Sequence, residues 1–217
     1  MDPDPRPAAP SPANGASSRR PAHRPSRRDA IVEAAIREFT ETGLSGATIG
    51  DVANRAGVSP AAVYYHFPTR EDLLIALVRR IGADVEACAA LRPGDDTRRG
   101  AELIDRVFRD YQEWIAVHPG EARLLWVEAA GRSPVVEAAR RETVTGIVER
   151  TVELFDIAGF ELAPTVAEVT ALGLVTVLLA TMELDVGTAG PAVSDRQLRH
   201  AMSTVGRRLL GSGTPVT

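Results

Sequence analysis

Apolar residues recur every three or four positions through most of this chain, and a strict alternation of apolar and polar residues is sustained nowhere. A period near 3.6 is that of an amphipathic helix, whereas half-buried strands alternate with a period of two. Between the periodic segments stand Gly, Pro, Ser and Thr residues of the kind that end one helix and cap the next. The pattern therefore predicts an all-α protein of about nine helices with short connections.

The segment 48–67 predicts two short helices joined by a three-residue turn. A capping box of Thr48 and Asp51 starts the first helix. Gly57 stands where the chain leaves that helix with a positive φ, and Ser59 caps the second helix. The apolar face of the first helix consists of Ile49, Val52, Ala53 and Ala56. This arrangement is typical of a helix-turn-helix.

The second helix of this motif has an unusual outer face. At about 100° per residue, Val63 and Phe67 share one side and are the predicted buried pair. Ala61 and Tyr65 then point the opposite way, with Tyr64 on the flank. Small residues and phenols suit a helix that enters the major groove of DNA. The alternative is a plain helical hairpin whose tyrosines are half-buried packing.

Further helices are expected over about residues 69–90, 97–117, 121–130, 134–158, 164–186 and 194–210. The run Val169–Met182 is apolar almost all round, yet it is shorter than the roughly 20 residues that a membrane span needs. We expect a helix that is buried on more than one side, with Gly173 and Ala180 allowing another helix to come close.

Composition divides the chain unevenly. Its 217 residues are 44% hydrophobic, carry a net charge of −4 and include no lysine. Residues 1–26 contain seven prolines and no periodicity, so they predict a disordered leader. The stretch Arg19–Arg28 is densely cationic, and it is either an arm that reaches DNA or a passive tail. We expect a leader at 1–26, a DNA-binding domain at 27–70 and a helical effector-binding and dimerisation domain at 71–217.

Signals of enzyme chemistry are missing from the sequence. It contains no Gly-rich phosphate loop, no zinc-spaced Cys/His set and no nucleophile elbow. We therefore expect no catalytic residues, metal or cofactor, although a helical-bundle enzyme with an incidental head domain remains the alternative. The single cysteine and an N-terminus without an apolar segment fit a cytoplasmic protein.

The run Arg28–Leu77 resembles the DNA-binding domain of the TetR (tetracycline repressor) family of transcriptional regulators. The matching residues include A-T-I-G-D-V-A-N-R-A-G-V-S and V-Y-Y-H-F-P-T-R-E-D-L-L. LacI-type repressors share T-I-x-D-V-A-x-x-A-G-V-S, but in them the motif opens the chain and a long α/β domain follows. Here an amphipathic helix precedes the motif, and a short helical region follows it.

The resemblance implies a DNA-contacting role for particular residues. Thr48, Tyr64, His66 and Arg70 match phosphate-contacting positions, although His66 could also be a packed core histidine. Pro60, Ala61 and Tyr65 match base-reading positions, and none of them offers the bidentate pairing that identifies guanine or adenine. The expected DNA-binding set is Arg27, Arg28, Thr48, Ser59, Pro60, Ala61, Tyr64, Tyr65, His66 and Arg70.

The resemblance also implies a small-molecule effector and a homodimer through residues 165–210. An aromatic stripe at helical spacing is either core or ligand pocket, and Tyr and Trp are favoured for a pocket because each has a polar group. The expected ligand-binding residues are Phe108, Tyr111, Trp114, Trp126 and Glu183, of which Glu183 could instead reach solvent. The implied function is a repressor released from a palindromic operator by an apolar effector; an activator of the same family is the alternative.

Overall fold

The computed structural model describes residues 26–95 and 100–185, and every regular element within them is helical. The all-α prediction is confirmed for this part of the chain. The leader and the helix expected over 194–210 lie outside the described residues. No helix among the described residues is long and apolar enough to cross a membrane.

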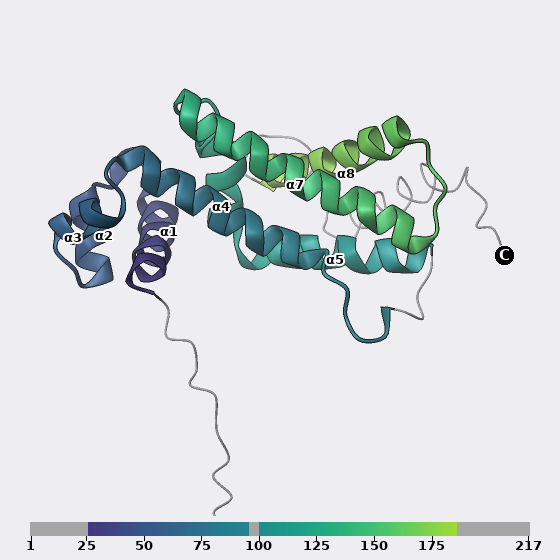
Figure 1. Cartoon of the computed structure of the whole chain (residues 1–217), viewed down its shortest axis with the longest axis horizontal. Helices are drawn as coiled ribbons and strands as arrows, with labels where there is room; N and C mark the ends of the chain where they lie inside the picture. The colour runs from purple at the N-terminus through teal and green to yellow at the C-terminus, as the bar shows by residue number, and fades with distance from the viewer. Residues whose placement is uncertain (1–25, 96–99, 186–217) are drawn as a thin grey trace, which may run out of the picture.

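Three helices, α1 (Arg27–Gly46), α2 (Ile49–Ala56) and α3 (Pro60–His66), form a head at one end of the molecule (Figure 1). The caps expected from the sequence are present. Thr48 Oγ1 accepts the backbone N–H of Asp51 at 3.2 Å, and Gly57 adopts φ 67° at the end of α2. Ser59 Oγ accepts the N–H of Ala62 at 3.2 Å, which begins α3.

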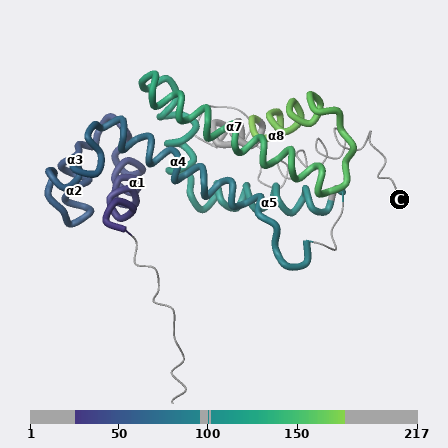
Figure 2. The backbone as a smooth tube through the Cα atoms, in the orientation of Figure 1, coloured from purple at the N-terminus to yellow at the C-terminus, as the bar shows by residue number. Residues whose placement is uncertain are grey.

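The long helix α4 (Arg70–Cys88) joins the head to the rest of the molecule. It leaves the head and runs along α5 (Ala101–Val117) and α7 (Pro134–Ala158), with α8 (Pro164–Asp185) beyond them (Figures 1 and 2). Its apolar face is buried along its whole length and belongs to a single hydrophobic core. The core members on this face are Leu73, Leu74, Leu77, Val78, Ile81 and Val85.

The end of α4 is tied to α5 by a buried ion pair. Arg106 on α5 donates to Asp95 at 2.5 Å and to the carbonyl of Cys88 at 3.3 Å, and its side chain is 7% exposed. Cys88 itself is buried, and burial raises the pKa of its thiol to about 11. These contacts fix the loop that follows α4.

The helix expected over residues 121–130 differs from the one observed. It begins at Pro119, because proline fits the first turn of a helix where no backbone donor is missed. It is also split into α6 (Pro119–Arg123) and a π-helix, η2 (Leu124–Glu128). The Ala129 N–H closes the wider turn by donating to Leu124 O at 2.9 Å. Periodicity cannot distinguish such a turn from an α-helix.

The close packing of α4 on α7 yields a stability prediction. A Cβ at Gly82 would lie 2.1 Å from Cγ2 of Thr143, whose side chain is buried and donates to Ala139 O at 2.9 Å. Gly82→Ala should therefore lower the free energy of unfolding by about 1–3 kcal/mol, measured by urea denaturation. Thr143→Ser in the Gly82→Ala background removes the clashing methyl and should restore most of that loss.

Gly146 on α7 supplies the control. A Cβ there would lie 2.9 Å from Oε1 of Glu86, the far end of a flexible side chain on α4. Gly146→Ala should be neutral or slightly stabilising, because alanine is favoured over glycine inside a helix by roughly 0.5–1 kcal/mol. Equal losses in the two alanine variants would contradict a steric role for Gly82.

Candidate DNA-binding surface and effector cavity

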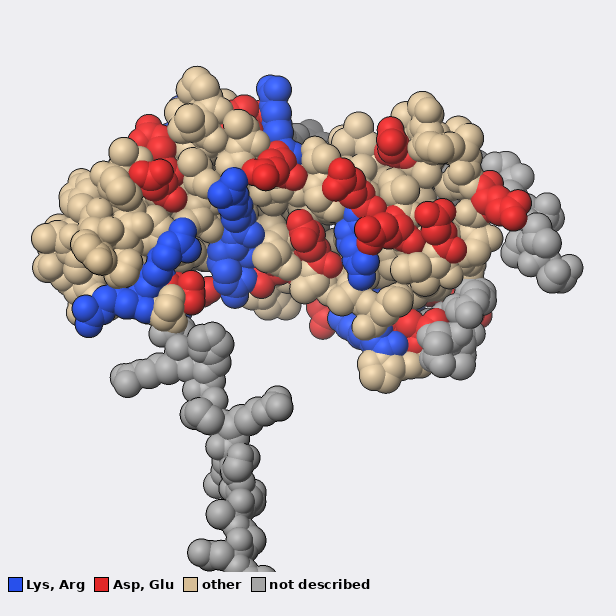
Figure 3. All heavy atoms as spheres, viewed as in Figure 1, with Lys and Arg blue, Asp and Glu red and all other residues tan. Residues whose placement is uncertain are grey.

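The outer face of α3 is the most exposed aromatic surface of the head. Tyr65 is 84% exposed and Tyr64 is 49% exposed, while Val63 and Phe67 on the inner face are fully buried. Ala61 is also exposed, and this agrees with the sides assigned from the sequence. On the face drawn in Figure 3, the end formed by α2 and α3 is largely uncharged, and acidic side chains lie mainly over the other half. Helix α3 is therefore open to a partner that accepts phenols and small apolar groups.

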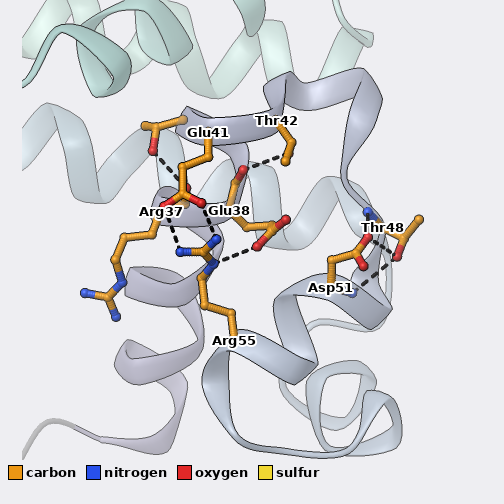
Figure 4. Close-up of polar contacts among 8 residues, drawn as sticks. Arg37, Glu38, Glu41, Thr42, Thr48, Asp51 and Arg55 are labelled. Atoms are coloured by element: carbon orange, nitrogen blue, oxygen red, sulfur yellow. Dashed lines mark hydrogen bonds and ion pairs between the residues drawn. The ribbon is translucent and has the colours of Figure 1, made fainter.

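Helix α2 is held on α1 by a bidentate ion pair. Arg55 Nε donates to Glu38 at 2.6 Å, and its two terminal nitrogens donate to both oxygens of Glu41 (Figure 4). The guanidinium lowers the pKa of the Glu41 carboxyl, and the two carboxylates raise the pKa of Arg55. Because this arginine is engaged within the head, it fixes the position of the helix-turn-helix on α1.

Thr48 sits at the exposed start of α2, where the sequence places a DNA contact. Its hydroxyl donates to Asp51 Oδ2 at 2.6 Å and accepts the Asp51 N–H (Figure 4). The Thr48 hydroxyl lowers the pKa of Asp51, which therefore stays ionised. The structure thus gives Thr48 a capping role, and a phosphate contact by its side chain stays a prediction.

His66 and Arg28 line a groove between α1 and α4. The groove has a volume of about 490 Å³, and Arg79 and Arg80 of α4 also line it. The Arg28 guanidinium lies 4.8 Å from the centre of the Phe67 ring, and His66 meets Tyr65 edge-on at 5.2 Å. Arg27 and Ser59 are exposed at the starts of α1 and α3.

Arg70 lies differently from the other expected DNA contacts. It is half-buried, one of its terminal nitrogens donates to the carbonyl of Leu44, and its guanidinium lies 5.5 Å from the Phe39 ring centre. The side chain therefore anchors α4 on α1 within the head. A contact with the DNA backbone would have to use its remaining donors.

Three of the five expected ligand-binding residues line one apolar cavity among α4, α5, α7, α8 and η2. Tyr111, Trp114 and Trp126 form its aromatic wall, and the cavity measures about 10 Å³. The remaining lining residues are Val85, Ile115, Ile147 and Val175. These four could not be told from ordinary core residues by sequence. Phe108 does not line the cavity, although its ring lies 6.2 Å from that of Tyr111.

The cavity wall has polar groups that the described residues leave incompletely bonded. Trp126 Nε1 is buried and has no hydrogen-bond partner there. The Tyr111 hydroxyl approaches Thr151 without completing a hydrogen bond of normal geometry. Burial raises the pKa of Tyr111 to about 12, so the phenol is neutral at physiological pH. Glu183 lies on α8, and its side chain is outside the described residues.

The described residues contain no cluster of His, Cys, Asp and Glu side chains that could hold a metal ion. The candidate site described above consists of two parts. One is an exposed aromatic helix at the tip of the head, and the other is a small apolar cavity with aromatic walls. Helix α4 connects the two.

Comparison with known proteins agrees with this layout. Residues 31–77 match the family of bacterial regulatory proteins called the tetR family. The chain is 35% identical over 85 residues to the HTH-type transcriptional regulator BetI of Rhizobium meliloti, and 38% identical over 85 residues to BetI of Agrobacterium fabrum. The first match covers 38% of this chain and 42% of that relative, so it spans less than half of the relative's length.

Solved structures extend the likeness to the helical region beyond the head. A multidrug binding protein, EbrR, complexed with imidazole superposes with a TM-score of 0.65 at 25% identity, over 89% of this chain and 99% of EbrR. A transcriptional regulator from Rhodococcus sp. Rha1 superposes with a TM-score of 0.68 at 24% identity, over 88% of this chain and 99% of the regulator. The match over residues 31–77 therefore identifies the head as a DNA-binding domain of the tetR family of bacterial regulatory proteins, and the solved structures show that the helical region has the fold of such regulators.

Proposed function

We propose that this protein is a ligand-responsive DNA-binding transcriptional regulator, a repressor that a small and largely apolar effector releases from a palindromic operator. The observation that carries this proposal is the pairing of an exposed reading helix, α3, near the start of α4 with an aromatic-walled cavity near its end. The names of the relatives support it, since BetI is an HTH-type transcriptional regulator and EbrR a multidrug binding protein.

In this proposal, Tyr65, Ala61 and Pro60 face the bases and the flanking groups contact phosphates. The phenol of Tyr65 supplies a hydrogen bond, and the small residues pack against thymine methyl groups. The flanking groups are Arg27, Arg28, Thr48, Ser59, Tyr64, His66 and Arg70. Such a regulator acts in the cytoplasm and is associated with the nucleoid when it is bound to DNA.

The proposed dimer uses the outer face of α8. Val166, Val169 and Leu172 on this face are 50%, 65% and 51% exposed in the single chain. Gly173 on the same face is exposed, and a Cβ there would meet nothing within 4 Å. A contiguous exposed apolar face is typical of an interface, and a second copy of the chain buries it with two-fold symmetry. Two heads related in this way fit two half-sites of a palindrome.

Effector binding then controls the spacing of the heads. Tyr111, Trp114 and Trp126 contact the ligand, with Phe108 behind them and Glu183 near the end of α8. The ligand must favour the DNA-free spacing by about 1–3 kcal/mol or more to release the operator. Operator DNA must in turn weaken ligand binding by the same factor.

The first functional prediction concerns DNA recognition. In fluorescence anisotropy with a fragment of the protein's own promoter, Tyr65→Ala should change the preference among operator variants by about 1–3 kcal/mol at the bases it reads. Arg28→Ala should instead weaken all sequences alike and reduce the salt slope by about 1, because one phosphate contact is lost.

Tyr65→Phe is the matched control, since it keeps the ring and removes only the hydroxyl. If the phenol donates to a base, this variant should share the changed preference of Tyr65→Ala; if the ring alone matters, it should behave like the wild type. Absence of any specific complex at low salt for the wild-type protein would rule out the proposed function.

A second prediction concerns assembly. Val169→Asp should yield monomers in sedimentation analysis and weaken operator binding, because a single head reaches only one half-site. Val117→Asp is the control, since Val117 is 66% exposed at the end of α5 and outside the proposed interface. Gly173→Trp should also dissociate the dimer while leaving each protomer folded, because the single chain has open space there. A dimeric Val169→Asp variant would place the interface elsewhere.

A third prediction addresses the leader. Deleting residues 1–25 should leave the thermal midpoint nearly unchanged, because α1 starts with its own cap at Ser26. If the leader is an arm on DNA, the deletion should also lower the salt slope of operator binding. An unchanged slope would identify a passive tail.

A further inference from the structure

The π-helix η2 brings the cavity and the head within five residues of each other. Trp126 in the middle of η2 lines the cavity, where its ring meets that of Trp114 edge-on at 6.4 Å. Glu128 at the end of η2 points to the head and accepts the backbone N–H of Leu44 at 2.8 Å. A displacement of this turn would therefore change both the cavity wall and the hydrogen bond to the head.

The Leu44 N–H that Glu128 accepts lies at a bend in α1. The backbone leaves helical geometry at Gly43, with φ 74° and ψ 160°, and a Cβ at that position would lie 3.6 Å from Glu128 Oε2. The next residue, Leu44, is 1% exposed. Glycine allows the positive φ, and a Cβ there would meet the carboxylate only at an ordinary van der Waals distance.

The carbonyl side of Leu44 is held as well. Arg132, which follows η2, donates to Leu44 O at 3.2 Å and to Ser45 Oγ at 3.1 Å, and Arg70 donates to the same carbonyl. The amide of Leu44 is thus bound by η2, and its carbonyl is bound both by the residue Arg132 after η2 and by Arg70 at the start of α4. We call this set of hydrogen bonds the Leu44 clamp. From Leu44 the chain runs through Ala47 directly into α2, so this clamp sets where the helix-turn-helix leaves α1.

Occupation of the cavity requires a wall to move. A volume of about 10 Å³ holds at most about one water molecule, so any larger effector must displace side chains. Val85, Tyr111, Ile147 and Val175 are buried and confined by the core, whereas Trp114, Ile115 and Trp126 are partly buried, and of these three only Trp126 lies on the π-helix. A π-helix is rare, and its hydrogen bonding is easily rearranged to that of an α-helix, which is why such turns occur often at functional sites. We therefore expect Trp126 to be the lining residue that moves when a ligand enters the cavity.

We propose that η2 couples the cavity to the head: an effector that displaces Trp126 withdraws Glu128 from the Leu44 amide and frees the helix-turn-helix from the position that fits the operator. This inference rests on the proposed function. The effector is of a defined class, an uncharged and largely apolar molecule with a hydrogen-bond acceptor for the buried Trp126 Nε1, since every lining residue is apolar or aromatic. Glu128 is a positioning residue in this scheme, because it acts on DNA through α1.

The coupling can be tested without knowing the effector. The chain has two tryptophans, and both line the cavity. In a Trp114→Phe background the emission of Trp126 reports on η2 alone. Because coupling is reciprocal, adding a fragment of the protein's own promoter should shift this emission. Glu128→Ala in the same background should abolish the shift and weaken promoter binding about tenfold, within the 5–150-fold range typical of coupled sites.

Two variants separate the clamp from other roles of Glu128. Glu128→Gln keeps an oxygen that accepts the Leu44 amide and should retain both promoter affinity and the emission shift. Arg123→Gln breaks the 3.1 Å ion pair between Arg123 and Glu128 on the exposed side and should change neither. If Glu128→Ala does not fold in circular dichroism, Arg132→Ala replaces it, because it removes a donor to the carbonyl of the same residue, Leu44.

The outcomes distinguish the two proposals. If the wild-type chain binds no specific promoter site, the proposed function itself fails and the coupling fails with it. If the wild-type chain binds but Trp126 emission stays constant, or shifts equally in Glu128→Ala, the coupling through η2 is overturned while the function stands. Glu128→Gln behaving like Glu128→Ala would also overturn it, because the charge and not the clamp would then matter.

Discussion

The whole structure depends on one helix, α4, that packs both against the head and against the helical domain. Its first half packs on α1 of the head, and its second half lies against α5 and α7, yet its buried side chains belong to one uninterrupted core. The absence of a side chain at Gly82 brings α7 into direct contact with α4, where Thr143 fills the space. Because α4 runs from the head into the helical domain without a flexible linker, a shift of α7 or η2 against α4 also displaces the end of α4 that packs on the head.

Most of the fold followed from local signals that are written in the sequence. Capping residues such as Thr48, Ser59 and Thr69 mark helix starts because a side-chain oxygen must satisfy free N–H groups, and each of them is a cap in the structure. The buried and exposed sides of α3 followed from helical periodicity alone. The π-helix did not, because its one wider turn leaves no trace in the spacing of apolar residues.

The candidate site was predictable to a lesser degree. Tyr and Trp could be selected for the cavity because each combines a large apolar body with a polar group. Phe108 satisfies the same helical spacing and its ring lies near that of Tyr111, yet it does not line the cavity, a difference that only the three-dimensional packing decides. The role of Arg70 illustrates another limit: a cation near a recognition helix can serve the protein's own backbone as well as that of DNA. The clamp at Leu44 joins residues more than eighty positions apart and has no sequence signature.

The environment of Cys88 determines how the chain's thiol chemistry behaves. It is the chain's one cysteine, it is 8% exposed, and its thiol donates to the carbonyl of Asp84 at 3.6 Å. With its pKa raised to about 11, almost none of it is thiolate at neutral pH, and the thiolate is the form that oxidants and alkylating agents attack. Burial and the raised pKa therefore make this thiol a poor target for peroxide and for disulfide exchange. A cysteine introduced on the outer face of α3 or α8 would be the chain's one reactive thiol, ready for site-specific labelling.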